Sequence, residues 1–171
     1  MSAFTHVYTG DGKGKTTAAL GLALRAAGAG WPVFIGQFAK GMRYSELAAL
    51  ERFADRITIR QFGRRSFIDR EPEDGDFDHA RRGLEESLDA VLSGRYRLVV
   101  LDEANIAPAL GLFPLEELLE LMDAKPEGVE LVITGRWAHP QVIARADLVT
   151  EMREVKHYYR QGVLARTGIE K

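Results

Sequence analysis

The sequence predicts an α/β fold with a mainly parallel central sheet. Short apolar runs alternate along the chain with segments of helical periodicity, which is typical of strands joined by helical crossovers. The runs at 98–101 and 131–134 are almost wholly apolar, as expected for strands buried on both faces of a sheet. The 171 residues are 46% hydrophobic, which suits one compact domain spanning 1–171.

Five apolar runs are expected as strands, and a sixth as an edge strand. In chain order the strands cover 4–8, 33–38, 57–61, 98–101 and 131–134, with the edge strand at 148–151. Polar residues follow several of these runs. Because ligands on parallel sheets bind at the carboxyl ends of the strands, we expect these polar residues to converge on one edge of the sheet.

Segments with apolar residues at helical spacing separate the strands. The expected helices cover 15–29, 45–54, 78–92, 115–122 and 140–146. The first should end near Gly28 and Gly30, and Pro114 suits the opening of the fourth. The polar stretch 63–75 is rich in turn residues and is predicted as a loop. No internal repeat, linker or low-complexity tail is visible.

A glycine-rich loop lies between the first strand and the first helix. Its residues are Thr9, Gly10, Asp11, Gly12, Lys13, Gly14, Lys15, Thr16 and Thr17. Glycines allow backbone N–H groups to form an anion nest at a helix N-terminus, Lys15 adds a positive charge, and the Thr16 hydroxyl can reach Mg²⁺. Thr9 replaces the first glycine of the usual pattern. We predict that this loop binds the phosphates of ATP, and that the chain has the three-layer α/β/α fold of P-loop NTPases (RecA-like).

Two carboxylates, Asp102 and Glu103, follow the apolar strand 98–101. If these two acidic residues stood alone in the sequence, helix capping by Asp102 with a solvated Glu103 would explain them. Beside a phosphate-binding loop, a divalent cation on the triphosphate is the better explanation. We therefore predict Thr16, Asp102 and Glu103 as ligands of Mg²⁺ or Mn²⁺.

Composition excludes several other functions. The chain has no cysteine, so disulfides, thiolate metal sites and cysteine nucleophiles are absent. The net charge of −2 offers no basic surplus for nucleic acid or for an anionic membrane. Neither a signal peptide nor a membrane-spanning stretch is visible, and we expect a cytoplasmic protein. From the residues alone, a small kinase or ATPase and a nucleotide-dependent switch both stay open.

Further motifs resemble one family, the ATP:corrinoid adenosyltransferases of the CobA/CobO/BtuR type, over nearly the whole chain. They are the glycine loop with its additional Lys13, QFAKG at 37–41, LDE at 101–103, ITGR at 133–136, ADLVTEM at 146–152 and VKH at 155–157, followed by GV at 162–163 and GIE at 168–170. The resemblance implies that a cobalt(I) corrinoid attacks the 5′ carbon of ATP. Adenosine then moves to cobalt and triphosphate leaves.

The resemblance also implies roles for single residues and for partners. Lys15, Glu103 and Arg136 would act in catalysis, and Gln37 and Lys40 would join the loop in binding substrates. The family is commonly dimeric, so a homodimer is expected. An external reductant, such as a flavodoxin or reduced flavin, would reduce the corrinoid to the cobalt(I) state.

The chain departs from the family at the loop after the third strand. Family members carry an aromatic pair, F-x-W, that shields the lower face of the corrin. The corresponding stretch, 62–68, contains Phe67 but no tryptophan. We expect Phe67 to contribute to an apolar lower face, with packing on the core as the alternative.

Overall fold

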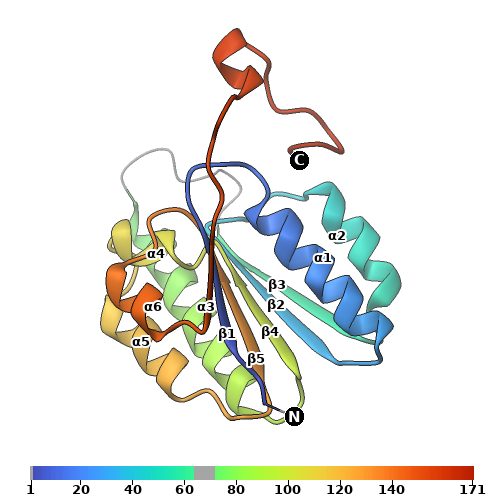
Figure 1. The fold of residues 1–171 in the computed structure, drawn as a ribbon, viewed down its shortest axis with the longest axis vertical. Helices are drawn as coiled ribbons and strands as arrows, with labels where there is room; N and C mark the ends of the chain where they lie inside the picture. Colours follow the sequence, from blue (N-terminus) through green and yellow to red (C-terminus); the bar gives the residue numbers. More distant parts are fainter. Residues whose placement is uncertain (1, 64–71) are drawn as a thin grey trace.

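The computed structural model describes residues 2–63 and 72–171, and its centre is one parallel sheet (Figure 1). The strands are β1 (Thr5–Thr9), β2 (Val33–Phe38), β3 (Ile57–Phe62), β4 (Leu98–Asp102), β5 (Glu130–Thr134) and β6 (Leu148–Glu151). Their order across the sheet is β3-β2-β4-β5-β1-β6, and every pairing is parallel. The predicted α/β fold is confirmed, including the edge strand at 148–151.

Helices cover both faces of this sheet. They are α1 (Lys15–Gly28), α2 (Ser45–Leu50), α3 (Asp74–Leu92), α4 (Ile106–Ala109), α5 (Leu115–Asp123) and α6 (Pro140–Arg145). In Figure 1, α1 and α2 lie on one side of the strands, and α3, α5 and α6 lie on the other. The arrangement is therefore the three-layer α/β/α architecture that the sequence predicts.

The residues of β4 show why this sheet needs two helical layers. All five are buried, and the four apolar side chains alternate between two separate hydrophobic clusters. Val99 and Leu101 join the cluster under α3 and α5, whereas Leu98 and Val100 join the cluster under α1. Since each face of the strand carries apolar side chains, either face left bare would expose them to water.

Two helices differ from the prediction at their ends. α3 begins at Asp74, four residues before the predicted start, so the loop that we predicted to reach Gly75 is too long. A capping box explains the early start: the Glu73 side chain accepts the backbone N–H of Asp76, and Asp76 accepts that of Glu73. The helix predicted for 45–54 ends at Leu50 and continues as a 3-10 turn, Glu51–Phe53.

The last twenty residues, 152–171, leave the sheet after β6 and have one short 3-10 helix, Tyr158–Gln161. In Figure 1 this segment rises from the carboxyl edge of the sheet and its end returns toward α1 and α2. Ser45 Oγ donates a hydrogen bond to the carbonyl of Lys171 at 3.1 Å. No helix in the described part of the chain is both long enough and apolar enough to cross a bilayer.

Candidate functional site

A cavity of about 970 Å³ opens at the carboxyl edge of the sheet. Ten of the predicted site residues line it: Asp11, Gly12, Lys13, Gly14, Lys15, Thr16, Thr17, Lys40, Glu103 and Arg136. They come from the glycine-rich loop, the start of α1 and the ends of β2, β4 and β5. The expected convergence of polar residues on one edge is thus confirmed.

Four predicted residues lie behind the lining: Thr9, Gly10, Gln37 and Asp102. Thr9 shows what takes the place of the first glycine in the loop. Its carbonyl accepts the N–H of Met152 at 2.8 Å, and its Oγ1 accepts the N–H of Ala138 at 3.3 Å. Thr9 therefore joins the loop to two neighbouring segments.

The chain leaving β6 packs directly on the glycine-rich loop. Gly10 and Gly14 have φ values of 93° and 120°, the left-handed region that favours glycine. Gly12 is required for a different reason, because a Cβ there would lie 2.7 Å from the carbonyl oxygen of Met152. The Gly12 N–H donates to that same oxygen at 2.7 Å. This N–H thus binds the chain itself, which differs from our expectation that it belongs to the anion nest.

Lys15 is the cation at the centre of the loop, and only 6% of it is exposed. Its ammonium donates to the carbonyls of Gly10 at 2.7 Å and Gly12 at 2.9 Å. Burial lowers the pKa of Lys15, an effect that the negative charge of Glu103 partly offsets. A phosphate oxygen would give this ammonium a charge-assisted partner, which is a stronger acceptor than a neutral carbonyl.

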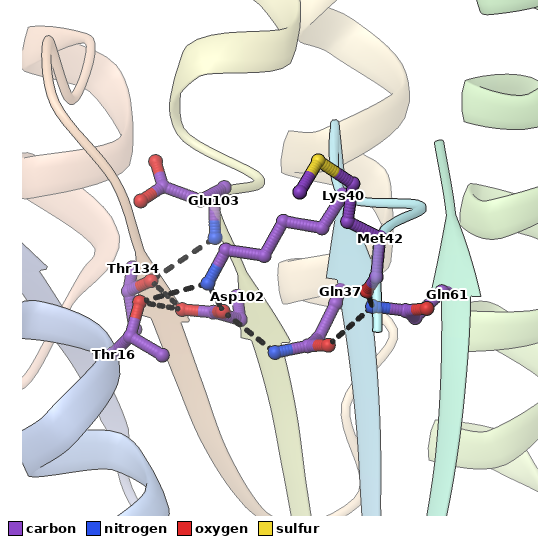
Figure 2. A network of polar contacts seen from close by, with 8 residues as sticks. All are labelled: Thr16, Gln37, Lys40, Met42, Gln61, Asp102, Glu103 and Thr134. Atoms are coloured by element: carbon purple, nitrogen blue, oxygen red, sulfur yellow. Dashed lines mark hydrogen bonds and ion pairs between the residues drawn. The ribbon is translucent and has the colours of Figure 1, made fainter. Parts of the chain in front are cut away.

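Asp102 is the centre of a buried polar network at the tip of β4 (Figure 2). Its Oδ1 accepts the hydroxyls of Thr16 at 2.9 Å and Thr134 at 2.7 Å. Its Oδ2 accepts the ammonium of Lys40 at 2.7 Å and the amide of Gln37 at 3.3 Å. The four donors satisfy a carboxylate that is fully buried.

Gln37 was predicted to bind a substrate, but in the structure it supports Asp102. Its Nε2 donates to the carboxylate, and its Oε1 accepts Nε2 of Gln61 from the neighbouring strand at 3.1 Å. Because Gln37 is wholly buried, it orients Asp102 from below the cavity.

Glu103 points differently from its neighbour. Its φ is 61°, and its side chain extends away from Asp102 in Figure 2 toward the cavity that it lines. Burial raises the pKa of Glu103, as does the negative charge of Asp102, while Lys40, Lys15 and Arg136 lower it. This carboxylate thus lies where a further cation would stabilise its charged form.

The donor set fits Mg²⁺. Thr16 offers a hydroxyl and Glu103 a carboxylate to the cavity, both hard oxygen ligands. Asp102, which was also predicted as a ligand, is buried and satisfied by four donors, so it supports Thr16 from behind. In the described part of the chain, no three acidic or histidine side chains lie close enough to hold a metal by themselves. Mg²⁺ is typically bound by one or two carboxylates, with the remaining ligands from water and phosphates. The residues therefore suit a metal that arrives with a triphosphate.

Backbone strain is concentrated around the cavity. The non-glycine residues with positive φ in the described ranges are Ala39, Glu103 and Trp137. Each follows the end of a different central strand, and each such residue costs on the order of 1 kcal/mol. Strain of this kind persists at sites where the chain must present particular groups to a ligand.

Sequence reasoning missed several parts of the cavity wall. Trp137 follows Arg136 and is 58% exposed, and Tyr44 precedes α2; both line the cavity. The C-terminal residues 168–171 also line the cavity, and Lys13 donates to the carbonyl of Ile169 at 2.9 Å. Residues 168–170 resemble a family motif, but their contact with the loop has no signal in spacing or periodicity. Phe67 lies outside the described residues, so its role stays a prediction.

A comparison with protein families decides which group the chain falls into. The model of the family "ATP:corrinoid adenosyltransferase BtuR/CobO/CobP" matches residues 2–170. The chain belongs to this family. The match spans the glycine-rich loop, Glu103 and the C-terminal segment, which all line the cavity, and also the buried Asp102.

Relatives named corrinoid adenosyltransferases agree with membership of this family. A corrinoid adenosyltransferase from Pseudomonas aeruginosa is 35% identical over 165 residues, covering 96% of this chain and 81% of its own. One from Escherichia coli K12 is 37% identical over 173 residues, covering 96% and 83%. A third, from Sinorhizobium, is 35% identical over 167 residues, covering 96% and 78%.

Proposed function

We propose that this protein transfers the 5′-deoxyadenosyl group of ATP to the cobalt(I) of a corrinoid and releases triphosphate. The observation that carries the proposal is the family match over residues 2–170. The cavity supports it, because the glycine-rich loop meets several cationic side chains and the Glu103 carboxylate there. A kinase, an ATPase or a switch protein is not favoured by a match of this extent.

The proposed reaction is a displacement at carbon. The electron pair of cobalt(I) forms the cobalt–carbon bond, cobalt becomes cobalt(III), and the pair of the C5′–O bond leaves with triphosphate. The leaving group gains negative charge, so cations beside it lower the barrier. Lys13, Lys15 and Arg136 line the cavity and are assigned this role. Because cobalt(I) is itself a strong nucleophile, no general base is needed.

A divalent metal would share the work of these cations. When bound, Mg²⁺ or Mn²⁺ would neutralise charge on the triphosphate. Thr16 and Glu103 would contact the metal from the cavity wall, with Asp102 supporting Thr16 from behind. Of the three, Glu103 is the residue whose carboxylate extends into the cavity (Figure 2).

Two partners belong to the same proposal. The chain has no cysteine and thus no thiol to deliver electrons. An external reductant such as a flavodoxin or reduced flavin would therefore reduce the corrinoid to cobalt(I). A homodimer is proposed from the family resemblance alone.

Formation of a cobalt–carbon bond tests the proposed function. Purified protein, ATP, Mg²⁺ and a chemically reduced corrinoid should give the absorption spectrum of an alkylated corrinoid. Light should then cleave the cobalt–carbon bond and abolish that spectrum. Omitting either ATP or protein should prevent the change. A corrinoid spectrum that stays unalkylated while ATP is consumed would rule out the transfer.

A further inference from the structure

Lys40 occupies an unusual position for a lysine. It follows β2 through Ala39, whose φ is 53°, and only 9% of it is exposed. Its ammonium donates to Asp102 Oδ2 at 2.7 Å and to Thr16 Oγ1 at 3.2 Å. In Figure 2 the side chain reaches across the tip of the sheet to place its charge between these two oxygens.

This ammonium covers Asp102 from the cavity. Lys40, Thr16 and Glu103 all line the cavity, whereas Asp102 is completely buried behind them. Burial lowers the pKa of Lys40, but the charge and hydrogen bond of Asp102 more than offset this, so the pKa is raised. The 2.7 Å ion pair with the buried Asp102 carboxylate thus keeps Lys40 in its charged form.

One of the two oxygens that hold Lys40, Thr16 Oγ1, is also proposed to contact the metal. Thr16 Oγ1 donates its proton to Asp102 and accepts from Lys40, which leaves one lone pair. A divalent ion on that oxygen would lie beside the ammonium, where two positive charges repel strongly in a poorly solvated site. A divalent ion therefore cannot bind Thr16 Oγ1 while the Lys40 ammonium stays in the position that it has in the structure.

We infer that Lys40 is a built-in cation that holds the metal position until nucleotide arrives. Phosphate oxygens then offer the ammonium a new acceptor and supply the ligands that the protein lacks, so metal enters as Lys40 moves. Without nucleotide the metal binds weakly, because it must displace the ammonium while no phosphate oxygen is present to accept that ammonium or to complete the metal's ligands. This inference rests on the proposed function, which places a triphosphate in the same cavity.

An aromatic ring on the cavity wall gives Lys40 a further partner. The Tyr44 ring lies 5.5 Å from its ammonium and also lines the cavity. An ammonium over an aromatic face keeps a favourable contact while its other donors turn to a new acceptor. Lys40 can thus reach toward phosphates without losing every partner.

Binding of Mn²⁺, measured by water-proton relaxation, tests the inference without any catalytic turnover. Lys40→Met removes the charge and keeps the length of the side chain. In the absence of ATP it should bind Mn²⁺ at least tenfold more tightly than the wild-type protein. With ATP present, the wild-type protein should form a tight ternary complex and the difference between the two should shrink.

Lys13→Met is the matched control, because Lys13 lines the same cavity but bonds to Ile169 and Glu170. If removing any nearby charge is sufficient, both variants will gain Mn²⁺ affinity equally, and the specific role of Lys40 is wrong. An unchanged Mn²⁺ affinity in Lys40→Met also overturns the inference. A wild-type protein that forms no ternary complex with Mn²⁺ and ATP contradicts the proposed function instead.

Thermal unfolding keeps the test decisive if Lys40→Met is unstable. Loss of the ammonium leaves Asp102 buried without its charged partner, so the Tm of Lys40→Met should fall below that of the wild type. Mn²⁺ alone should restore that Tm, since it then enters the emptied position, while the wild-type Tm should hardly respond. Failure of Mn²⁺ to raise the Tm of the variant more than that of the wild type counts against the inference.

Discussion

Replacing Lys15 with alanine should reduce adenosyl transfer on the order of 100-fold or more, the range seen when one preorganised charge partner is removed from an active site. Lys15 is buried in the loop, and its ammonium lies over the carbonyls of Gly10 and Gly12. The triphosphate would lose its most enclosed cation in this variant. Steady-state kinetics with cobalt(I) corrinoid measures the loss in kcat/KM.

Two controls separate this effect from damage to the fold. Circular dichroism of Lys15→Ala should match the wild type, because the parallel sheet and both hydrophobic clusters do not depend on Lys15. Lys13→Ala should lose much less activity, since Lys13 is more exposed and binds the C-terminal segment. Activity of Lys15→Ala within about threefold of wild type, under ~1 kcal/mol, would remove the phosphate role of the loop.

Replacing Glu103 with glutamine should weaken metal-dependent turnover more than replacing Asp102 with asparagine. Glu103 lines the cavity, and its amide analogue offers a metal only a neutral oxygen. We expect its rate to fall at least tenfold at limiting Mg²⁺, with partial recovery as Mg²⁺ is raised. The measurement is the rate as a function of Mg²⁺ concentration in the two variants and the wild type.

The main effect of Asp102→Asn should instead be a loss of thermal stability. The buried Lys40 ammonium would lose its carboxylate, and breaking such a buried pair typically costs about 3–5 kcal/mol. Its Tm should therefore fall well below that of Glu103→Gln. If Glu103→Gln has the same Mg²⁺ dependence as the wild type, the assignment of Glu103 to the metal is wrong.

The fold was largely predictable because its signals are local. The buried strand 98–101 is apolar throughout, and the glycine-rich loop combines a strand end with a helix start. Both were assigned correctly. The early start of α3 was missed because Pro72 and Gly75 suggest a turn, while the reciprocal bonds of Glu73 and Asp76 that begin the helix depend on the folded backbone.

The site was predictable as a set of residues but not as a set of contacts. Lys40 meets Asp102 because β2 lies beside β4, a pairing between segments 62 residues apart that no periodicity reveals. The requirement for Gly12 also depends on strand order: β6 pairs with β1, and Met152, which follows β6, then packs on the loop. Each of these contacts follows from the order of strands across the sheet.

Phosphorus NMR of the spent reaction mixture shows which bond of ATP the protein breaks. If the chain breaks the C5′–O bond of ATP, reduced corrinoid and ATP should yield inorganic triphosphate in an amount equal to the adenosyl–cobalt product. Triphosphate, ADP with phosphate, and AMP with pyrophosphate have distinct spectra. Accumulation of ADP beside an unalkylated corrinoid would contradict the account and would indicate a kinase or an ATPase.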